Sequence, residues 1–276
     1  MWSAPPLLRR SLPRLSTLTT RSLASLPRDH DIKIVEVGPR DGLQNEKAHV
    51  SAADKIQLIQ LLAQAGCTYI ETGAFVSPKW VPSMATSQEV MEGLKGYEGR
   101  KGRVFSCLTP NTKGLEQAIQ AQADEIAIFG SASEAFSQKN INCSIEESLE
   151  RFSEVAQQAK EKDIPMRGYV SCVMVRPKEK GGGCIAGVPM IDRNIFLLQG
   201  CPYQGEVKPS EVARVTAKLL ELGCHEVSLG DTIGVGTPGP TKEVIAAVQV
   251  SFDSANLFNA HLFSPNLDEF LDDCSH

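Results

Sequence analysis

The sequence has no run of about 18 consecutive apolar residues, the length that a membrane-spanning helix needs, so we expect no membrane span. It has no excess of basic residues either, because the formal net charge is -5, which argues against a nucleic-acid partner. Its eight cysteines form no CxxC pair, so a zinc site has little support and reduced core thiols are expected. The chain does have 276 residues, of which 42% are hydrophobic, enough for one large domain or two small ones.

The first 28 residues lack acidic side chains altogether. They are rich in Ser, Thr and Leu, and their positive charge comes from five arginines: Arg9, Arg10, Arg14, Arg21 and Arg28. This composition predicts a mitochondrial transit peptide over 1–28, and therefore a protein of the mitochondrial matrix. The alternative is a disordered tail that carries no address.

The stretch 32–47 combines a short β-type run with a dense polar cluster. Its apolar, β-branched start predicts a buried strand that ends at Gly38 and Pro39. The polar residues follow directly: Arg40, Asp41, Gln44, Asn45, Glu46 and Lys47. Ligands of parallel α/β folds bind at the carboxyl ends of strands, so chemistry is expected here. The alternative is a strand followed by a solvated turn.

Apolar β-type runs and helical patterns then alternate along the chain. Further strands are predicted at 68–72, 104–108, 125–129, 166–171 and 226–229. Six strand–helix units predict a parallel α/β barrel or a doubly wound sheet. Glu71 and Asp231 follow strands as Arg40 and Asp41 do, and such groups converge on one face of a barrel.

Several long motifs carry a family resemblance. They are V-E-V-G-P-R-D-G-L-Q-N-E-K, I-E-T-G-A-F-V-S-P-K-W-V-P, Q-K-N-I-N-C-S-I-E-E-S, R-G-Y-V-S-C and V-S-L-G-D-T-I-G-V-G-T-P-G. Over residues 32–172 and 200–249 the chain resembles the 3-hydroxy-3-methylglutaryl-CoA (HMG-CoA) lyase family. The resemblance implies a (β/α)8 TIM barrel, a homodimer, and cleavage of an acyl-CoA substrate, HMG-CoA, to acetyl-CoA and acetoacetate with Mg²⁺ or Mn²⁺.

The resemblance also implies roles for individual residues. By this resemblance Asp41 is expected to be a metal ligand, since hard cations prefer oxygen ligands. Arg40 faces the thioester carbonyl and stabilises the enolate charge. Glu71 and Asp231 line the metal and water network, and two further side chains belong to the pocket: Gln44 and Tyr169.

The chain departs from the family pattern in three places. Gly73-Ala74 replaces a hydroxyl residue, and 173–199 reads as an insertion. After about residue 249 the resemblance stops, and the tail 250–276 has neither the His-x-His pair nor the Asn ligand and cysteine loop of the family. We therefore expect an incomplete barrel of about six β/α units over 29–249 that is inactive or nearly so as a lyase. The alternatives are a related barrel enzyme for another acyl-CoA, which the long motifs disfavour, and a non-catalytic form that associates with intact subunits or is degraded.

Overall fold

The computed structural model describes residues 33–46, 48–174, 201, 203, 205, 207–232 and 236–253, all within one compact unit of the chain. The predicted transit peptide lies outside these residues, as do nearly all of the predicted insertion at 173–199 and most of the tail. No helix among the described residues is long and apolar enough to cross a membrane.

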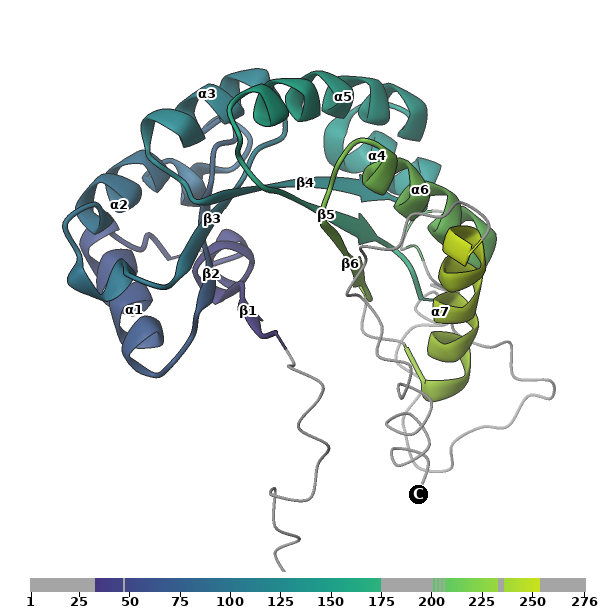
Figure 1. The fold of residues 1–276 in the computed structure, drawn as a ribbon, viewed down its shortest axis with the longest axis horizontal. Coiled ribbons are helices and arrows are strands. Elements are labelled where there is room, and N and C mark those ends of the chain that lie inside the picture. The colour runs from purple at the N-terminus through teal and green to yellow at the C-terminus, as the bar shows by residue number, and fades with distance from the viewer. Residues whose placement is uncertain are drawn as a thin grey trace, which may run out of the picture. The chain divides into compact units, whose positions relative to one another are not determined.

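Six parallel strands form one curled sheet in sequence order, which confirms the predicted six-unit α/β barrel architecture for the described part of the chain (Figure 1). The strands are β1 (Val35–Glu36), β2 (Tyr69–Ala74), β3 (Val104–Leu108), β4 (Glu125–Ser131), β5 (Met166–Ser171) and β6 (Glu226–Gly230). The α-helices are α1 (Ala52–Gln64), α2 (Ser87–Leu94), α3 (Thr112–Gln120), α4 (Glu134–Ile141), α5 (Ile145–Glu161), α6 (Pro209–Glu221) and α7 (Pro238–Asp253). Figure 1 shows the helices along the outer, convex face of the sheet.

Local sequence explains where these helices begin. The Ser51 hydroxyl accepts a hydrogen bond from the Asp54 amide at the start of α1. Ser144 and Glu147 form the predicted capping box of α5, each side chain bonding the other's backbone amide. Helix α4 has no counterpart among the sequence predictions, and it lengthens the wall of the site described below.

The main core lies between the outer face of the sheet and the helices. Strand side chains at alternate positions, such as Ile126 and Ile128, are fully buried there, because period-two alternation turns them to one face. The opposite, inner face carries Ala127 and Leu108 in a smaller apolar cluster. The predicted core role of the cysteines is confirmed for the described ones, which are unpaired by disulfides and mostly buried.

The first strand corrects one expectation. The apolar run before Gly38 predicts a buried strand, but β1 has only two residues and Ile34 is exposed. Among the described strands β1 lies at the sheet edge and pairs with β2 alone, so its side chains are covered on one side only.

Candidate active site

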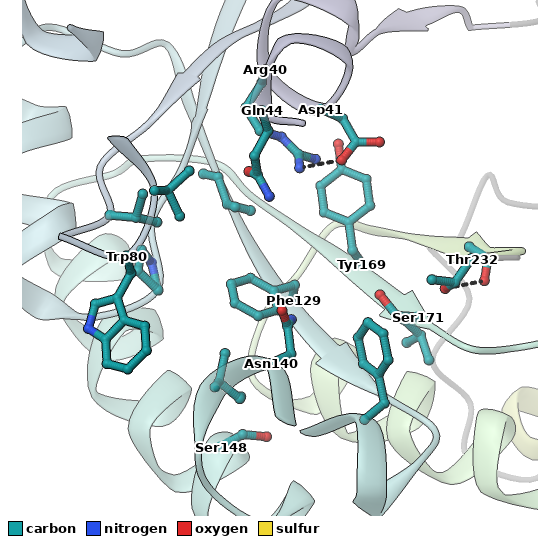
Figure 2. Close-up of a pocket in the computed structure, with 18 of the residues that line it drawn as sticks. Arg40, Asp41, Gln44, Trp80, Phe129, Asn140, Ser148, Tyr169, Ser171 and Thr232 are labelled. Atoms are coloured by element: carbon teal, nitrogen blue, oxygen red, sulfur yellow. Dashed lines mark hydrogen bonds and ion pairs between the residues drawn. The ribbon is translucent and has the colours of Figure 1, made fainter. Parts of the chain in front are cut away.

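A pocket of about 970 Å³ opens at the carboxyl ends of the strands. Its wall takes side chains from the turn after β1, from the ends of β3 to β6, and from α4 and α5. Figure 2 shows Arg40, Asp41 and Tyr169 gathered at one side of this pocket, with Trp80 on the other. The predicted convergence of residues from separate strand ends is therefore what the fold produces.

The turn after β1 places Arg40. Residues Gly38–Gly42 form one π-helical turn in which the Asp41 amide donates to the Val37 carbonyl at 2.7 Å. The Gly38 amide donates to the Glu36 carboxylate at 2.6 Å, which anchors the start of the turn. The turn folds the Arg40 side chain inward, so that the residue is only 8% exposed. The alternative of an ordinary solvated turn is thus wrong at Arg40.

Arg40 belongs to a buried three-residue cluster that also contains Glu71 of β2 and Tyr169 of β5. The Arg40 Nε donates to Glu71 Oε1 at 2.5 Å, and the Tyr169 hydroxyl donates to Glu71 Oε2. Glu71 has no exposed surface, so its charge is balanced by these two donors rather than by water. The guanidinium of Arg40 also lies 5.7 Å from the centroid of the Tyr169 ring.

These contacts fix the protonation states of the cluster. Burial by itself would lower the pKa of Arg40, but the charge and hydrogen bond of Glu71, followed by the charge of Asp41, raise that pKa above its ordinary value. Burial raises the pKa of Tyr169, and the neighbouring Glu71 charge raises it further. At neutral pH the site therefore presents a permanent cation beside a neutral phenol.

Asp41 behaves differently from its neighbour. Its side chain is 57% exposed, lines the pocket, and accepts a hydrogen bond from Arg40 Nη1 at 2.9 Å. Gln44 lies on the same wall, and Asp231 lines the pocket from the end of β6. The Oδ2 atom of Asp231 accepts from the Gly236 amide at 2.7 Å, which closes the loop after that strand.

The structure thus brings five of the six predicted site residues to the pocket wall: Arg40, Asp41, Gln44, Tyr169 and Asp231. Glu71, the sixth, lies behind the wall and holds two of its members. Their predicted chemical roles stay predictions. Packing explains why glycine occupies position 73, since a Cβ atom there would lie 2.6 Å from the Ser87 hydroxyl oxygen. That hydroxyl accepts a hydrogen bond from the Ala74 amide.

Sequence analysis missed the far wall of the pocket. Helices α4 and α5 contribute two cationic side chains, Lys139 and Arg151, together with Phe136 and Phe152. The loop after β2 adds Trp80, a residue that is 84% exposed. The only early signal for this wall was the length of the Q-K-N-I-N-C-S-I-E-E-S motif.

The described residues do not fit a complete divalent-cation site. None of them form a group of three or more His, Cys, Asp or Glu side chains that could hold a metal ion. Glu71 is engaged by Arg40 and Tyr169, which leaves the exposed Asp41 as the predicted ligand at this end of the pocket. One carboxylate holds Mg²⁺ weakly, because that ion gives up its water reluctantly.

Reactive thiols are also excluded at three described positions near the sheet. Burial raises the pKa of Cys107, Cys172 and Cys224 to about 12 in each case. Such thiols stay protonated at neutral pH and behave as small apolar side chains.

Residues 31–262 match the HMGL-like family. The human protein named hydroxymethylglutaryl-CoA lyase, mitochondrial, is 47% identical over 248 residues, which are 87% of this chain and 67% of that protein. A Pseudomonas aeruginosa 3-hydroxy-3-isohexenylglutaryl-CoA/hydroxymethylglutaryl-CoA lyase is 49% identical over 217 residues, or 79% of this chain and 63% of that protein. The chain therefore spans about two thirds of the length of these relatives.

Solved structures give the same likeness. The crystal structure of hydroxymethylglutaryl-CoA lyase from Pseudomonas aeruginosa matches with a TM-score of 0.68 and 48% identity, covering 80% of this chain and 65% of that one. An Acinetobacter baumannii HMG-CoA lyase in complex with coenzyme A and 3-methylmalate matches with a TM-score of 0.66 and 30% identity. That match covers 82% of this chain and 65% of the solved one.

Proposed function

This chain belongs to the HMGL-like family, and we propose on that basis that it is a carbon–carbon lyase for HMG-CoA. The proposed products are acetyl-CoA and acetoacetate. The observation that carries the proposal is the buried Arg40 cation, fixed by Glu71 at the edge of a pocket formed by the strand ends. The relative solved with coenzyme A supports an acyl-CoA as the substrate class.

Arg40 would act on the charge that the reaction creates. When the bond between C2 and C3 of the substrate breaks, its electron pair moves to C2 and gives the enolate of acetyl-CoA. A preorganised cation stabilises such a charge without reorganising, and one donor of this kind contributes about 2.7–4 kcal/mol in comparable sites. Glu71 keeps the guanidinium in place, because both of its carboxylate oxygens are bonded to site residues.

The proton balance needs a base and an acid. The tertiary hydroxyl of the substrate loses its proton as its carbon becomes the ketone of acetoacetate, and C2 gains a proton afterwards. Asp231 is the pocket carboxylate that we assign to the hydroxyl side of the substrate, since it follows β6, whereas Arg40 follows β1 at the opposite edge of the described sheet. Tyr169 positions Glu71, because its hydroxyl proton already lies in that hydrogen bond.

The assignment of cell compartment and assembly belongs to the same proposal. The relatives named as mitochondrial and the acid-free start of the chain support import into the mitochondrial matrix. A homodimer is proposed from the family resemblance. The described residues do not form a complete site for the divalent cation that the family resemblance implies.

A second candidate function follows from that same observation. Because the described part of the chain assembles no metal site, the second candidate is a non-catalytic partial barrel that binds intact subunits or is degraded. It differs from the lyase in one measurable way: an active lyase would hold about one divalent ion per chain, as metal-assisted catalysis requires.

Acetoacetate release from HMG-CoA, measured with saturating Mg²⁺ or Mn²⁺, separates the two functions. The lyase predicts turnover by the wild-type chain that falls about 10²–10³-fold in Arg40→Gln. Arg103→Gln is the matched control, because Arg103 bonds only backbone carbonyls of residues 63, 67 and 99, away from the pocket. Absent turnover together with absent bound metal would refute the lyase and support the second candidate.

A further inference from the structure

The inner face of the sheet carries a second arginine, Arg167, in the same strand as Tyr169. The two residues are two positions apart in β5, so period-two alternation places both side chains on the inner face. Barrel interiors are usually filled with layers of Val, Ile and Leu. Arg167 is only 8% exposed, so a buried cation occupies a position where an apolar side chain is the rule.

The guanidinium of Arg167 lies against the site cluster. Its Cζ atom is 5.3 Å from the centroid of the Tyr169 ring, while the Cζ atom of Arg40 is 5.7 Å from the same centroid. A cation at this distance from an aromatic ring is attracted by the ring quadrupole, and more strongly when both are desolvated. The ring of Tyr169 therefore has two cationic neighbours, the guanidinium groups of Arg40 and Arg167, and its hydroxyl donates a hydrogen bond to Glu71.

Arg167 is itself held from the other side by β6. Its Nε lies 2.8 Å from Glu226 Oε1, and its Nη2 donates to the Ser228 hydroxyl at 2.5 Å. Glu226 is in turn bonded through Oε2 to the Lys33 ammonium at 2.9 Å. A chain of alternating charges thus runs along the inner face from Lys33 to the Tyr169 ring.

We propose that Arg167 is a positioning residue for the lyase site, acting through the Tyr169 ring on Glu71 and through Glu71 on Arg40. This inference rests on the proposed function. Arg167 does not line the pocket, so it has no contact with a substrate there. Its contribution is to fix the ring, because a ring held in one place keeps the Tyr169 hydroxyl on Glu71 and so keeps the guanidinium of Arg40 aimed at the pocket.

A purely structural role for Arg167 is the rival explanation, in which its ion pair with Glu226 only joins β5 to β6. The two explanations differ in what happens when the link through Tyr169 is cut. In a Tyr169→Phe protein the ring no longer bonds Glu71, so a positioning effect has no route to Arg40. A structural effect would be unchanged there, because it does not pass through the hydroxyl.

The first test is a double-mutant cycle on HMG-CoA cleavage with Arg167→Met and Tyr169→Phe. In the wild-type background Arg167→Met should lower kcat about 10–100-fold, the scale of a small misplacement, with KM changed less than about threefold. In the Tyr169→Phe background the same change should lower kcat by less than about threefold. Arg167→Lys keeps the charge but not the planar guanidinium, so its kcat should lie between that of Arg167→Met and that of the wild type.

The second test needs no activity. A urea-denaturation cycle of Arg167→Met against Tyr169→Leu measures the contact itself, since leucine removes the ring. The two shifts in midpoint should be non-additive, whereas the same cycle with Arg103→Met should be additive, because Arg103 donates to the backbone carbonyls of residues 63, 67 and 99 rather than contacting the Tyr169 ring. Should Arg167→Met fail to fold, Arg167→Lys takes its place in both cycles.

The outcomes separate this inference from the function beneath it. A wild-type chain without turnover overturns the proposed lyase. In that case, and also if the Tyr169→Phe protein has no measurable turnover, the urea cycle decides whether Arg167 holds the ring. Equal losses of kcat in both backgrounds, or an additive urea cycle where that cycle decides, would overturn the positioning role. Non-additivity confined to the Arg167 pair supports it.

Discussion

Replacing Glu71 by glutamine removes the one negative charge that the buried Arg40 guanidinium meets away from solvent. Removing one partner of a buried ion pair typically destabilises a protein by about 3–5 kcal/mol, because the other charge stays buried without compensation. Arg40 keeps its ion pair with Asp41, but that carboxylate is 57% exposed and contributes at most about 1 kcal/mol. The amide of glutamine can still accept from Tyr169. We therefore expect a loss of about 3 kcal/mol in the free energy of unfolding.

Urea denaturation followed by circular dichroism measures this loss, with the slope of the transition checked for constancy. The informative control is the double variant Arg40→Met/Glu71→Leu, in which both charges are replaced by apolar groups of similar size. Because no buried charge is left without a partner, the double variant should be more stable than Glu71→Gln alone. A single substitution in an exposed pair, Lys218→Met, should leave the urea midpoint nearly unchanged, since the side chains of Lys218 and Glu221 are half exposed and solvent screens their charges.

A loss below about 1 kcal/mol in Glu71→Gln would contradict this reasoning, because it lies in the range of solvent-exposed pairs. It would mean that water reaches the guanidinium of Arg40. A double variant less stable than Glu71→Gln would contradict it differently, by showing that packing at this position matters more than charge.

Three further predictions concern other parts of the chain. In a full-length version that carries the family's remaining strands, Arg40→Gln should leave Mg²⁺ or Mn²⁺ binding unchanged and lower kcat about 10²–10³-fold, whereas Asp41→Ala should weaken metal binding; titration calorimetry showing the reverse pattern would exchange the two roles. The hydrogen bond to Glu125 raises the pKa of His225, although burial acts in the opposite direction. The protonated His225 therefore stabilises the fold fully below the unfolded pKa of about 6.5, and this stabilisation is lost as pH rises through the folded pKa. His225→Gln should remove that part of the pH dependence from urea midpoints, and an unchanged profile would exclude it. Protein recovered from mitochondria should begin near residue 29, after cleavage at Arg28, which intact-mass measurement checks directly.

Sequence alone predicted the six strands and the side chains that follow them, because both are local properties of the chain. Strands were recognisable from apolar runs, and the polar groups after β1 and β6 stood out against them, whereas Glu71, which was expected to follow a strand, lies within β2. The partner of Glu71 was not predictable in the same way. Tyr169 lies 98 residues further along the chain, and only the family resemblance had marked it as a pocket residue.

Two other features could not be predicted from the sequence, for physical reasons. Helix α4 is short, and its eight residues include too few apolar positions to show a helical period. The inward turn of Arg40 depends on a π-helical turn at Gly38–Gly42, whose Pro and Gly residues indicate a turn of some kind without specifying its type.

The contact between Tyr169 and Glu71 also reports on the shape of the sheet. Strands β2 and β5 are separated by β3 and β4, and three strand spacings in a flat sheet amount to about 14 Å. Side chains that stand perpendicular to a flat sheet could not close that distance, whereas inner-face side chains converge when the sheet curls. The Tyr169 hydroxyl does reach Glu71, so curvature is what assembles the Arg40 site from strands that are not neighbours. Any change that flattens the sheet between β2 and β5 should therefore separate Tyr169 from Glu71 before it disrupts a single strand pairing.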